Sequence, residues 1–307
     1  MDNVTSNSII HDLRRINLIS GKGGVGRTTL AAALARASAA EGKKTLLLEI
    51  EDDSGWDSAL ARSFGRKHFQ ADPEPLDKNL YGISLSAAVG QERFLQSFLR
   101  LKSLTDLVMG NQGVRWFLEG APAFKEMGVF FHLLLQMRSD FDTLILDLPA
   151  TGHFVGLARL PEILLKMIPF GPIAERLREG QKFLYDRSSS AVWIVTLPQP
   201  LPVSEAIELS TVLRNESLPF GGFILNRAPF NPFTEQEEEL LEGLSRKSPV
   251  GKLLVDLERI RRFRESRNRL RDSLVTGQDR GSVWVSPESL RPDQELLMIR
   301  KLKKVEC

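Results

Sequence analysis

Glycines dominate the first stretch whose residue types could do chemistry, ISGKGGVGRTT at residues 19–29. An apolar run typical of a β-strand precedes it, and an alanine-rich run typical of a helix follows it. The backbone N–H groups of such a loop and the N-terminus of the following helix both point toward an anion. We therefore expect a phosphate-binding loop, whose members are Gly21, Lys22, Gly23, Gly24, Val25, Gly26, Arg27, Thr28 and Thr29.

Two phosphate-binding patterns fit the same letters. Gly21, Gly23 and Gly26 satisfy G-x-G-x-x-G, the pattern of dinucleotide-binding folds. Either Glu49 or Glu51 stands about where a ribose-binding acid would end the second strand. This interpretation predicts a nicotinamide-linked oxidoreductase, although the glycine pattern alone has little specificity.

The competing pattern is the nucleoside-triphosphate loop, G-x-x-x-x-G-K-[ST], from which the chain differs only by having Arg27 in place of lysine. Thr28 supplies the hydroxyl that Mg²⁺ takes from such a loop, and the strand TLILD ends in Asp147, where a Mg²⁺-associated acid is expected. In the segment LPATGHF that follows, Thr151 and Gly152 are candidates for a switch that senses the γ-phosphate. A dinucleotide fold explains none of these features, so we favour a triphosphate with Mg²⁺.

The strands and helices that position these residues can be predicted from the sequence. Short β-branched or leucine-rich runs alternate with helical patterns, which predicts an α/β fold with a mostly parallel sheet flanked by helices. The expected strands are Ile16–Ser20, Thr45–Ile50, Gly82–Ser86, Thr143–Asp147, Ala191–Leu197, Gly221–Asn226 and Ser282–Val285. The expected helices are Thr28–Ala40, Val203–Arg214, Thr234–Ser245, Leu257–Leu274 and Pro292–Lys303.

Residues 90–140 and 153–187 break this alternation, because they contain no clear strand and carry Phe, Leu and Met at helical spacing. We expect them to form a helical insertion within a single domain that spans residues 1–307. Apolar helical stripes usually belong to a core, which favours packing on the sheet; a groove for a protein partner is the alternative. The stripe residues are Phe94, Phe98, Leu101, Val129, Leu133 and Met137.

Composition bounds the class of function. The chain has 307 residues, of which 42% are hydrophobic, and a net charge of +2, so we expect neither a nucleic acid nor an anionic membrane as partner. No run of about eighteen apolar residues occurs, so we expect a cytoplasmic protein without integral membrane insertion. The single cysteine, Cys307, allows neither an internal disulfide nor a cysteine-based zinc site within one chain.

One segment is strongly basic, LERIRRFRESRNRLRDSL at residues 257–274. Acidic residues interrupt its arginines, which is typical of a solvated helix face with ion pairs. A patch for an acidic partner or a nucleic acid is the alternative.

Several motifs together resemble one family. GKGGVGRTT resembles the deviant Walker A motif of the ParA, MinD and nitrogenase iron-protein class. TLILDLPATGHFVGLARLP, WIVTLPQPLPVSEAIEL and FILNR are similar, in the same order, to segments of the arsenite-pump ATPase (ArsA) and tail-anchored-protein-targeting family. The resemblance runs from about Ile16 to Pro287. It implies a P-loop ATPase that uses ATP with Mg²⁺ and works as a homodimer or as a heterodimer with a paralogous ATPase.

The resemblance also assigns roles to single residues. It implies that Lys22 reaches across a dimer to the partner's phosphates, and that Thr28 and Asp147 organise Mg²⁺. Asn226 is expected to read the adenine edge. Pro287 is expected near the adenine, as part of a closing loop.

The chain departs from this family at two catalytic positions. Arginine is longer, planar and fork-shaped, so Arg27 can hold phosphate oxygens without occupying the place of the family's lysine. Because misplacing a catalytic group by about an ångström costs on the order of a hundredfold in rate, we expect slow hydrolysis. In the first switch segment the family's D-P-A-H-S is replaced by EDDSG, where Glu51 is our candidate for positioning the attacking water.

The cargo sites of the family are also missing. The arsenite pump's soft-metal site needs several cysteines and the targeting factor's zinc site needs a C-x-x-C pair, and this chain has neither. His153 matches the histidine of the second switch segment, and we assign it a structural or signalling role rather than metal binding.

These observations predict a Mg-ATP-binding dimeric switch whose slow ATPase activity depends on Lys22, Arg27 and Glu51. The helical insertion would couple nucleotide state to an unknown protein client. A non-hydrolysing, nucleotide-bound scaffold subunit that pairs with an active paralogue is the second hypothesis. The nicotinamide-linked oxidoreductase is the third.

Overall fold

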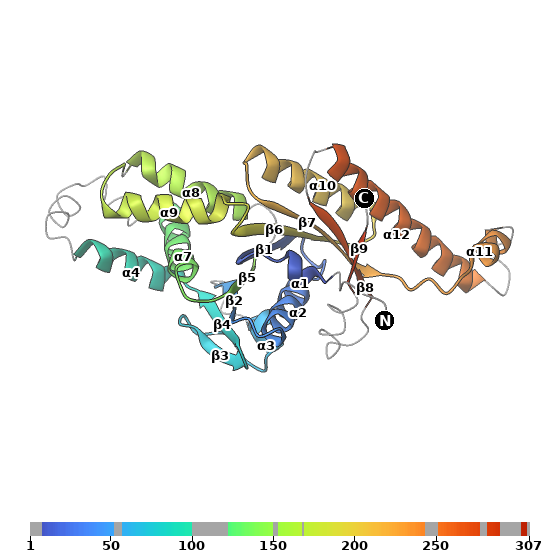
Figure 1. Ribbon diagram of the computed structural model, residues 1–307, viewed down its shortest axis with the longest axis horizontal. Helices are drawn as coiled ribbons and strands as arrows, with labels where there is room; N and C mark the ends of the chain where they lie inside the picture. Colours follow the sequence, from blue (N-terminus) through green and yellow to red (C-terminus); the bar gives the residue numbers. More distant parts are fainter. Residues whose placement is uncertain are drawn as a thin grey trace, which may run out of the picture.

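A single sheet of nine strands organises the computed structural model of the chain (Figure 1). The structure describes residues 8–51, 57–99, 122–149, 153–167, 169–242, 251–276, 281–288 and 302–305. The strand order is β3-β4-β2-β5-β1-β6-β7-β8-β9. The strands are β1 (Ile16–Gly21), β2 (Thr45–Ile50), β3 (Glu74–Asp77), β4 (Leu80–Leu85), β5 (Thr143–Asp147), β6 (Ser190–Thr196), β7 (Phe220–Ala228), β8 (Ser282–Pro287) and β9 (Lys303–Val305).

The seven inner strands, from β4 to β8, run parallel to one another, whereas the edge strands β3 and β9 pair antiparallel with their neighbours. Strands β1 and β6 are buried along their whole length. Near-continuous apolar runs such as VWIV are typical of parallel strands that helices cover on both faces. The parallel arrangement brings the carboxyl ends of these strands to one edge of the sheet, where ligands bind in such folds.

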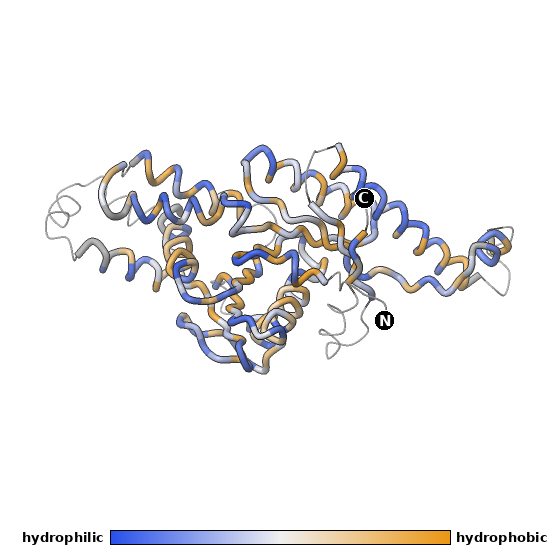
Figure 2. The backbone as a smooth tube through the Cα atoms, viewed as in Figure 1, coloured by the Kyte–Doolittle hydropathy of each residue, from blue (hydrophilic) through white to orange (hydrophobic). Residues whose placement is uncertain are grey.

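One face of the sheet is covered by α2 (Arg27–Ala40), together with the short helices α1 (Ile9–Asp12) and α3 (Ala59–Arg62). Alanines at positions 31, 32, 33 and 35 of α2 are completely buried, so the helix lies close to the strands. In Figure 2 the hydrophobic colour is concentrated in α2 and in the strands beside it. The helix that follows the glycine-rich loop is thus fixed on the sheet by its side chains.

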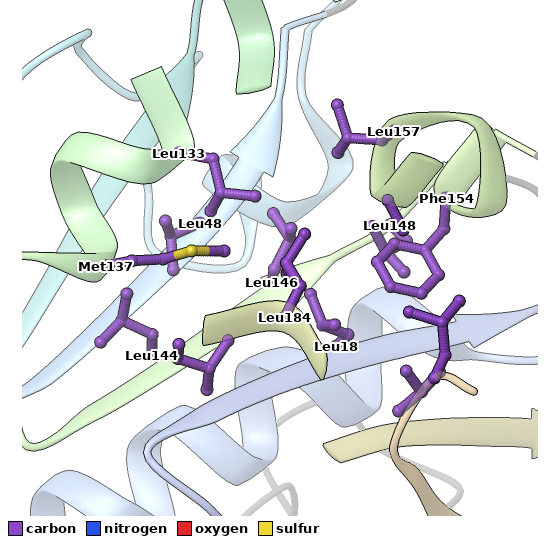
Figure 3. Packing of buried hydrophobic residues seen from close by; sticks show 14 of the residues in the cluster. Leu18, Leu48, Leu133, Met137, Leu144, Leu146, Leu148, Phe154, Leu157 and Leu184 are labelled. Carbon is purple, nitrogen blue, oxygen red and sulfur yellow. The ribbon is translucent and has the colours of Figure 1, made fainter. Parts of the chain in front are cut away.

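The other face carries α4 (Ala87–Leu99), α7 (Pro122–Met137), α8 (His153–Met167), α9 (Pro172–Tyr185), α10 (Pro200–Asn215) and α12 (Gly251–Thr276). In Figure 3, Leu133 and Met137 of α7 lie over Leu48 and Leu144 of the sheet. Of the predicted stripe residues, Phe94, Val129, Leu133 and Met137 are buried, as packing on the sheet requires, while the side chain of Phe98 and all of Leu101 lie outside the described part.

The basic helix α12 contacts α11 (Glu235–Glu242) at one end. Arg264 of α12 and Glu238 of α11 form a two-bond pair, with distances of 2.6 and 2.7 Å between their nitrogen and oxygen atoms. Arg262 pairs with Glu258 one turn away at 2.6 Å. These contacts agree with the interpretation of this segment as a helix face with ion pairs.

All seven predicted strands are present, with ends shifted by no more than two residues. The edge strands β3 and β9 were not predicted. The sequence of β3, EPLD, contains a proline and two acids, which disfavour a strand except at an edge. The prediction of a helix that reaches Lys303 was wrong at its end, because Lys303 begins β9; residues 292–301 lie outside the described part.

No helix in the described ranges is both long and apolar enough to cross a membrane.

Candidate functional site

The glycine-rich loop leaves the carboxyl end of β1 and leads directly into α2. Gly24 and Gly26 have positive φ angles of 82° and 95°, which only glycine adopts without strain. Gly26 is also the N-cap residue of α2, and no side chain in the described part of the chain caps this helix end. The first N–H groups of α2 are therefore left for a ligand, and an anion suits them best because the helix N-terminus carries a partial positive charge.

Close contacts explain two of the glycines. A Cβ atom on Gly21 would lie 2.4 Å from the carbonyl oxygen of Val195 on β6, and φ at Gly21 is 148°. A Cβ atom on Gly26 would lie 2.4 Å from the side-chain nitrogen of Asn226 on β7. The loop is thus pressed against two neighbouring strands, and glycine is required at both positions.

Thr28 and Asp147, predicted as the Mg²⁺ pair, are in direct contact. The Thr28 hydroxyl donates a hydrogen bond of 2.7 Å to Oδ2 of Asp147. The other oxygen, Oδ1, is buried and has no hydrogen-bond partner among the described residues. Burial raises the pKa of Asp147, and the hydrogen bond from Thr28 and the charge of Arg27 oppose this effect. A hydroxyl beside an unsatisfied carboxylate oxygen fits Mg²⁺, which prefers oxygen ligands.

Asp147 opens onto a cavity of about 500 Å³ between the loop, β2 and α3. Glu49 of β2 lies directly opposite Asp147 in the strand register. Burial raises the pKa of Glu49, and the nearby Asp147 raises it further, against a 2.5 Å hydrogen bond from Ser58. The cavity is lined by Arg27, Thr28, Glu49, Ile50, Glu51, Asp57, Ser58, Ala59, Leu60, His68, Phe69, Ser84, Asp147, Leu148 and Pro149.

Glu51, the predicted water-positioning group, lines the same cavity and is exposed at its edge. The structure therefore brings Glu51 to the same space as Thr28 and Asp147. Among the described residues no three His, Cys, Asp or Glu side chains gather into a metal site.

Arg27 extends toward β5. Its guanidinium donates a hydrogen bond to the carbonyl oxygen of Leu148, the residue after Asp147. The side chain thus crosses one wall of the cavity and joins the loop to the chain that leaves β5. That Arg27 does not occupy the place of the family's lysine stays a prediction; in this structure its guanidinium contacts the Leu148 carbonyl oxygen.

Lys22 extends to the opposite flank. Its ammonium group forms an ion pair with Glu205 of α10. Both residues line a second hollow of about 400 Å³ between the loop, β6 and α10. Sequence reasoning missed Glu205, although the WIVTLPQPLPVSEAIEL segment that contains it was singled out.

Asn226 and Pro287 lie at the same edge of the sheet as the loop. The side-chain amide of Asn226 donates a 2.9 Å hydrogen bond to the carbonyl oxygen of Val25, and Asn226 is almost fully buried. Through this contact Asn226 supports the loop. Pro287 ends β8, beside Ala228 of β7.

The switch residues are only partly described. His153 is the first residue of α8. Thr151 and Gly152 lie outside the described residues, as do Asp52 and Asp53 of the first switch segment. Shortly after the first switch segment, α3 begins at Ala59, and Ser58 caps it by accepting a hydrogen bond from the N–H of Ala61.

A parallel α/β sheet with a glycine-rich loop between β1 and α2 is shared by P-loop NTPases and dinucleotide-binding folds. The contact between Thr28 and Asp147 favours the class of P-loop NTPases. Comparison with known proteins gives the family. Residues 14–171, slightly more than half of the chain, match the model of the Anion-transporting ATPase (ArsA) family, and the chain belongs to this family. Membership of an ATPase family favours the triphosphate interpretation of the loop over the dinucleotide one.

Three relatives illustrate the range of the family. The chain is 27% identical over 232 residues to ATPase BagA of Mycobacterium tuberculosis, a match that covers 69% of this chain and 65% of BagA. It is 27% identical over 239 residues to the Arsenical pump-driving ATPase of Escherichia coli, covering 74% of this chain and 38% of that protein. It is 30% identical over 176 residues to ATPase GET3 of Eremothecium gossypii, covering 52% and 48%. The match thus spans just under two thirds of BagA.

Proposed function

We propose that this ArsA-family chain is a Mg-ATP-binding switch that hydrolyses ATP slowly and works as a dimer. The observation that carries the proposal is the Thr28–Asp147 contact beside an uncapped helix N-terminus. It supports a site for a phosphate chain together with a cation, because the helix end attracts the anion and the carboxylate attracts the metal.

Thr28 and Asp147 would hold Mg²⁺, directly or through water, and the N–H groups of the loop and of α2 would hold the β- and γ-phosphates. When bound, Mg²⁺ neutralises charge that develops on the phosphate oxygens. Glu51 lies at the edge of the same cavity, where its carboxylate can orient a water molecule and accept its proton.

Arg27 limits the rate in this proposal. Its guanidinium keeps the charge that the family's lysine provides, and its five N–H donors allow one contact with Leu148 and others with phosphate oxygens. A group tied to the wall of the cavity is less free to follow the γ-phosphate as the bond breaks. Binding is therefore retained better than turnover.

Lys22 and the helices beside the site support the proposed dimer and its protein client. Lys22 points to the flank opposite the cavity, as expected of a group that serves the phosphates of a second chain. The partner chain is a second copy or a paralogous ATPase. Strand β5 ends at Asp147, and α8 begins six positions later at His153. A movement of Asp147 on nucleotide binding would therefore displace the start of α8, one of the helices that would contact a protein client.

A second candidate is a nucleotide-bound scaffold that does not hydrolyse ATP. The contact between Arg27 and Leu148 favours this candidate. Arg27 is the cation of the loop that lines the cavity, and the contact occupies one of its N–H donors, which is then not available to the phosphates. In this case an active paralogue in the dimer supplies turnover.

A single-turnover assay tests both candidates. Purified chain in excess over labelled ATP and Mg²⁺ is followed for retained label and for conversion to ADP. We expect tight retention with slow conversion, over many minutes. Retention without conversion would leave the scaffold, and failure to retain Mg-ATP would contradict both.

A further inference from the structure

We propose that Glu205 is a positioning residue that holds Lys22 on its own chain until nucleotide-dependent pairing releases it. The inference rests on the proposed function, in which Lys22 acts on the phosphates of a partner chain. The proposed function gives Glu205 no role, whereas here this carboxylate of α10 controls the position of Lys22.

The contact is direct and lies away from the nucleotide cavity. The ammonium group of Lys22 and Oε1 of Glu205 form an ion pair, with side-chain exposures of 50% and 32%. Lys22 is absent from the lining of the 500 Å³ cavity that contains Arg27, Thr28 and Asp147. In this conformation the ammonium group of Lys22 lies at α10, on the flank of the loop opposite Arg27.

Glu205 depends on Lys22 for its charge balance. Its second oxygen, Oε2, is buried and has no hydrogen-bond partner among the described residues. When Lys22 leaves, Glu205 keeps a partly desolvated carboxylate without the cation that compensates it, which is unfavourable. The ion pair thus opposes the departure of Lys22, and pairing of two chains must overcome it.

The carboxylate sits on a fixed element. Helix α10 begins with Pro200, and Arg269 of α12 donates to the Ser204 hydroxyl at 2.9 Å and to the Pro200 carbonyl oxygen at 3.4 Å. Figure 1 shows α10 and α12 side by side, and the two helices are in contact. Glu205 is therefore held in place by its helix, and Lys22 on the loop is the mobile member of the pair.

The chain offers a matched control on the same helix. Glu208 lines the same 400 Å³ hollow, is exposed, and makes no ion pair or hydrogen bond within the described ranges. Glu205→Gln and Glu208→Gln remove the same charge from the same surface. Only Glu205→Gln removes the partner of Lys22, so a general charge effect cancels in the comparison.

The first measurement uses the nucleotide-free chain and does not depend on ATP binding. Lysines are acetylated with a limiting reagent, and the modification of Lys22 is quantified by mass spectrometry relative to Lys43. We expect Lys22 to react about two- to fivefold faster in Glu205→Gln than in Glu208→Gln, the range of an exposed ion pair. Equal reactivity in the two variants overturns the inference.

The second measurement is ATP-dependent dimerisation. Sedimentation in Mg-ATP measures it for the wild-type chain, Glu205→Gln and Glu208→Gln. A symmetric dimer releases two lysines, so we expect Glu205→Gln to pair about fourfold to twenty-fivefold more tightly than wild type, with Glu208→Gln unchanged. Equal or weaker pairing of Glu205→Gln overturns the restraining role. If none of the three chains dimerises while the reactivity of Lys22 still depends on Glu205, the result contradicts the proposed dimer and supports the contact between Lys22 and Glu205.

Discussion

The two cations of the glycine-rich loop lie on opposite flanks and meet different surroundings. On the β5 flank, Arg27 reaches the Leu148 carbonyl oxygen beside two half-buried carboxylates, Glu49 and Asp147. On the β6 flank, Lys22 reaches Glu205, a single carboxylate on a helix. On the β5 flank, the two carboxylates of Glu49 and Asp147 lie beside one cation, Arg27. On the β6 flank, Lys22 is already paired with a carboxylate.

Strand order explains the difference. Strand β1 lies between β5 and β6, so the loop that leaves it has one neighbour on each side. Arg27, at the start of α2, faces β5, while Lys22, directly after β1, faces β6 and α10. In the proposed function, the β5 flank would bind a ligand together with a metal ion, and the β6 flank would restrain Lys22 until a partner chain binds.

The largest expected effect is on the β5 flank. Asp147→Asn keeps the shape of the side chain and removes the charge that would hold Mg²⁺, so we expect single-turnover ADP formation to fall by about a hundredfold or more. Asp142→Asn is the control. Asp142 directly precedes β5, at the end of the strand opposite Asp147, and accepts a hydrogen bond from the backbone N–H of Lys44. Equal rates in the two variants would remove Asp147 from the site.

The contact of the loop with the β6 flank is tested by a glycine pair. Gly21→Ala places a Cβ atom 2.4 Å from the Val195 carbonyl oxygen, whereas a Cβ atom on Gly23 meets nothing within 4 Å. We expect Gly21→Ala to lower the free energy of unfolding by about 1–3 kcal/mol relative to Gly23→Ala. Urea denaturation without nucleotide measures the difference. Matching midpoints would show that the loop is not pressed against β6.

Replacing the unusual cation sharpens the contrast between the flanks. Arg27→Lys removes the guanidinium that reaches Leu148 and supplies a compact, flexible ammonium group. We expect ADP formation to speed up about tenfold while ATP retention changes little. Faster hydrolysis without tighter binding identifies Arg27 as the rate limit. A slower variant would mean that arginine is the working group here.

The smallest expected effect is a pH dependence at Glu49. Burial raises its pKa, so the folded chain binds its proton more tightly than the unfolded chain does. Stability from this group therefore falls as pH rises from the ordinary glutamate pKa to the raised one. At pH 7 the nucleotide-free Glu49→Gln chain should have a higher Tm than wild type, and the difference should vanish at acidic pH.

Asp186 gives the opposite sign and serves as the comparison. Hydrogen bonds from Ser189 and Ser188 lower its pKa to about 2, so its stabilisation is present at neutral pH and is lost as pH falls toward 2. We expect Asp186→Asn to have a lower Tm than wild type at pH 7. If Glu49→Gln also lowers Tm at pH 7, burial does not set the charge cost at Glu49.

Local patterns were enough to predict the centre of the fold and to place Thr28 and Asp147 near each other. The apolar runs gave the inner strands, and parallel strands necessarily bring Thr28 and Asp147 to one edge. The edge strands β3 and β9 were missed because pairing with a neighbour, not their own composition, makes them strands. Pattern reasoning identifies elements that carry their own signal and misses those that depend on a neighbour.

The two flanks of the loop were harder to predict. Lys22 and Glu205 are 183 positions apart, and their contact depends on where α10 packs on the sheet. The Arg27–Leu148 contact depends on a side-chain conformation, which spacing does not determine. Glu49 was considered only as a ribose-binding acid, because its position opposite Asp147 requires the strand register.

In the proposed function, Arg27 serves the nucleotide of its own chain and Lys22 serves that of the partner chain. A complementation assay tests it directly, with Lys22→Ala and Asp147→Asn chains that are each inactive in single-turnover hydrolysis. Mixed dimers would combine an intact metal site on one chain with Lys22 from the other, so mixing should restore about a quarter of wild-type ADP formation in a symmetric dimer. A mixture as inactive as its components, although the chains pair, would contradict the account.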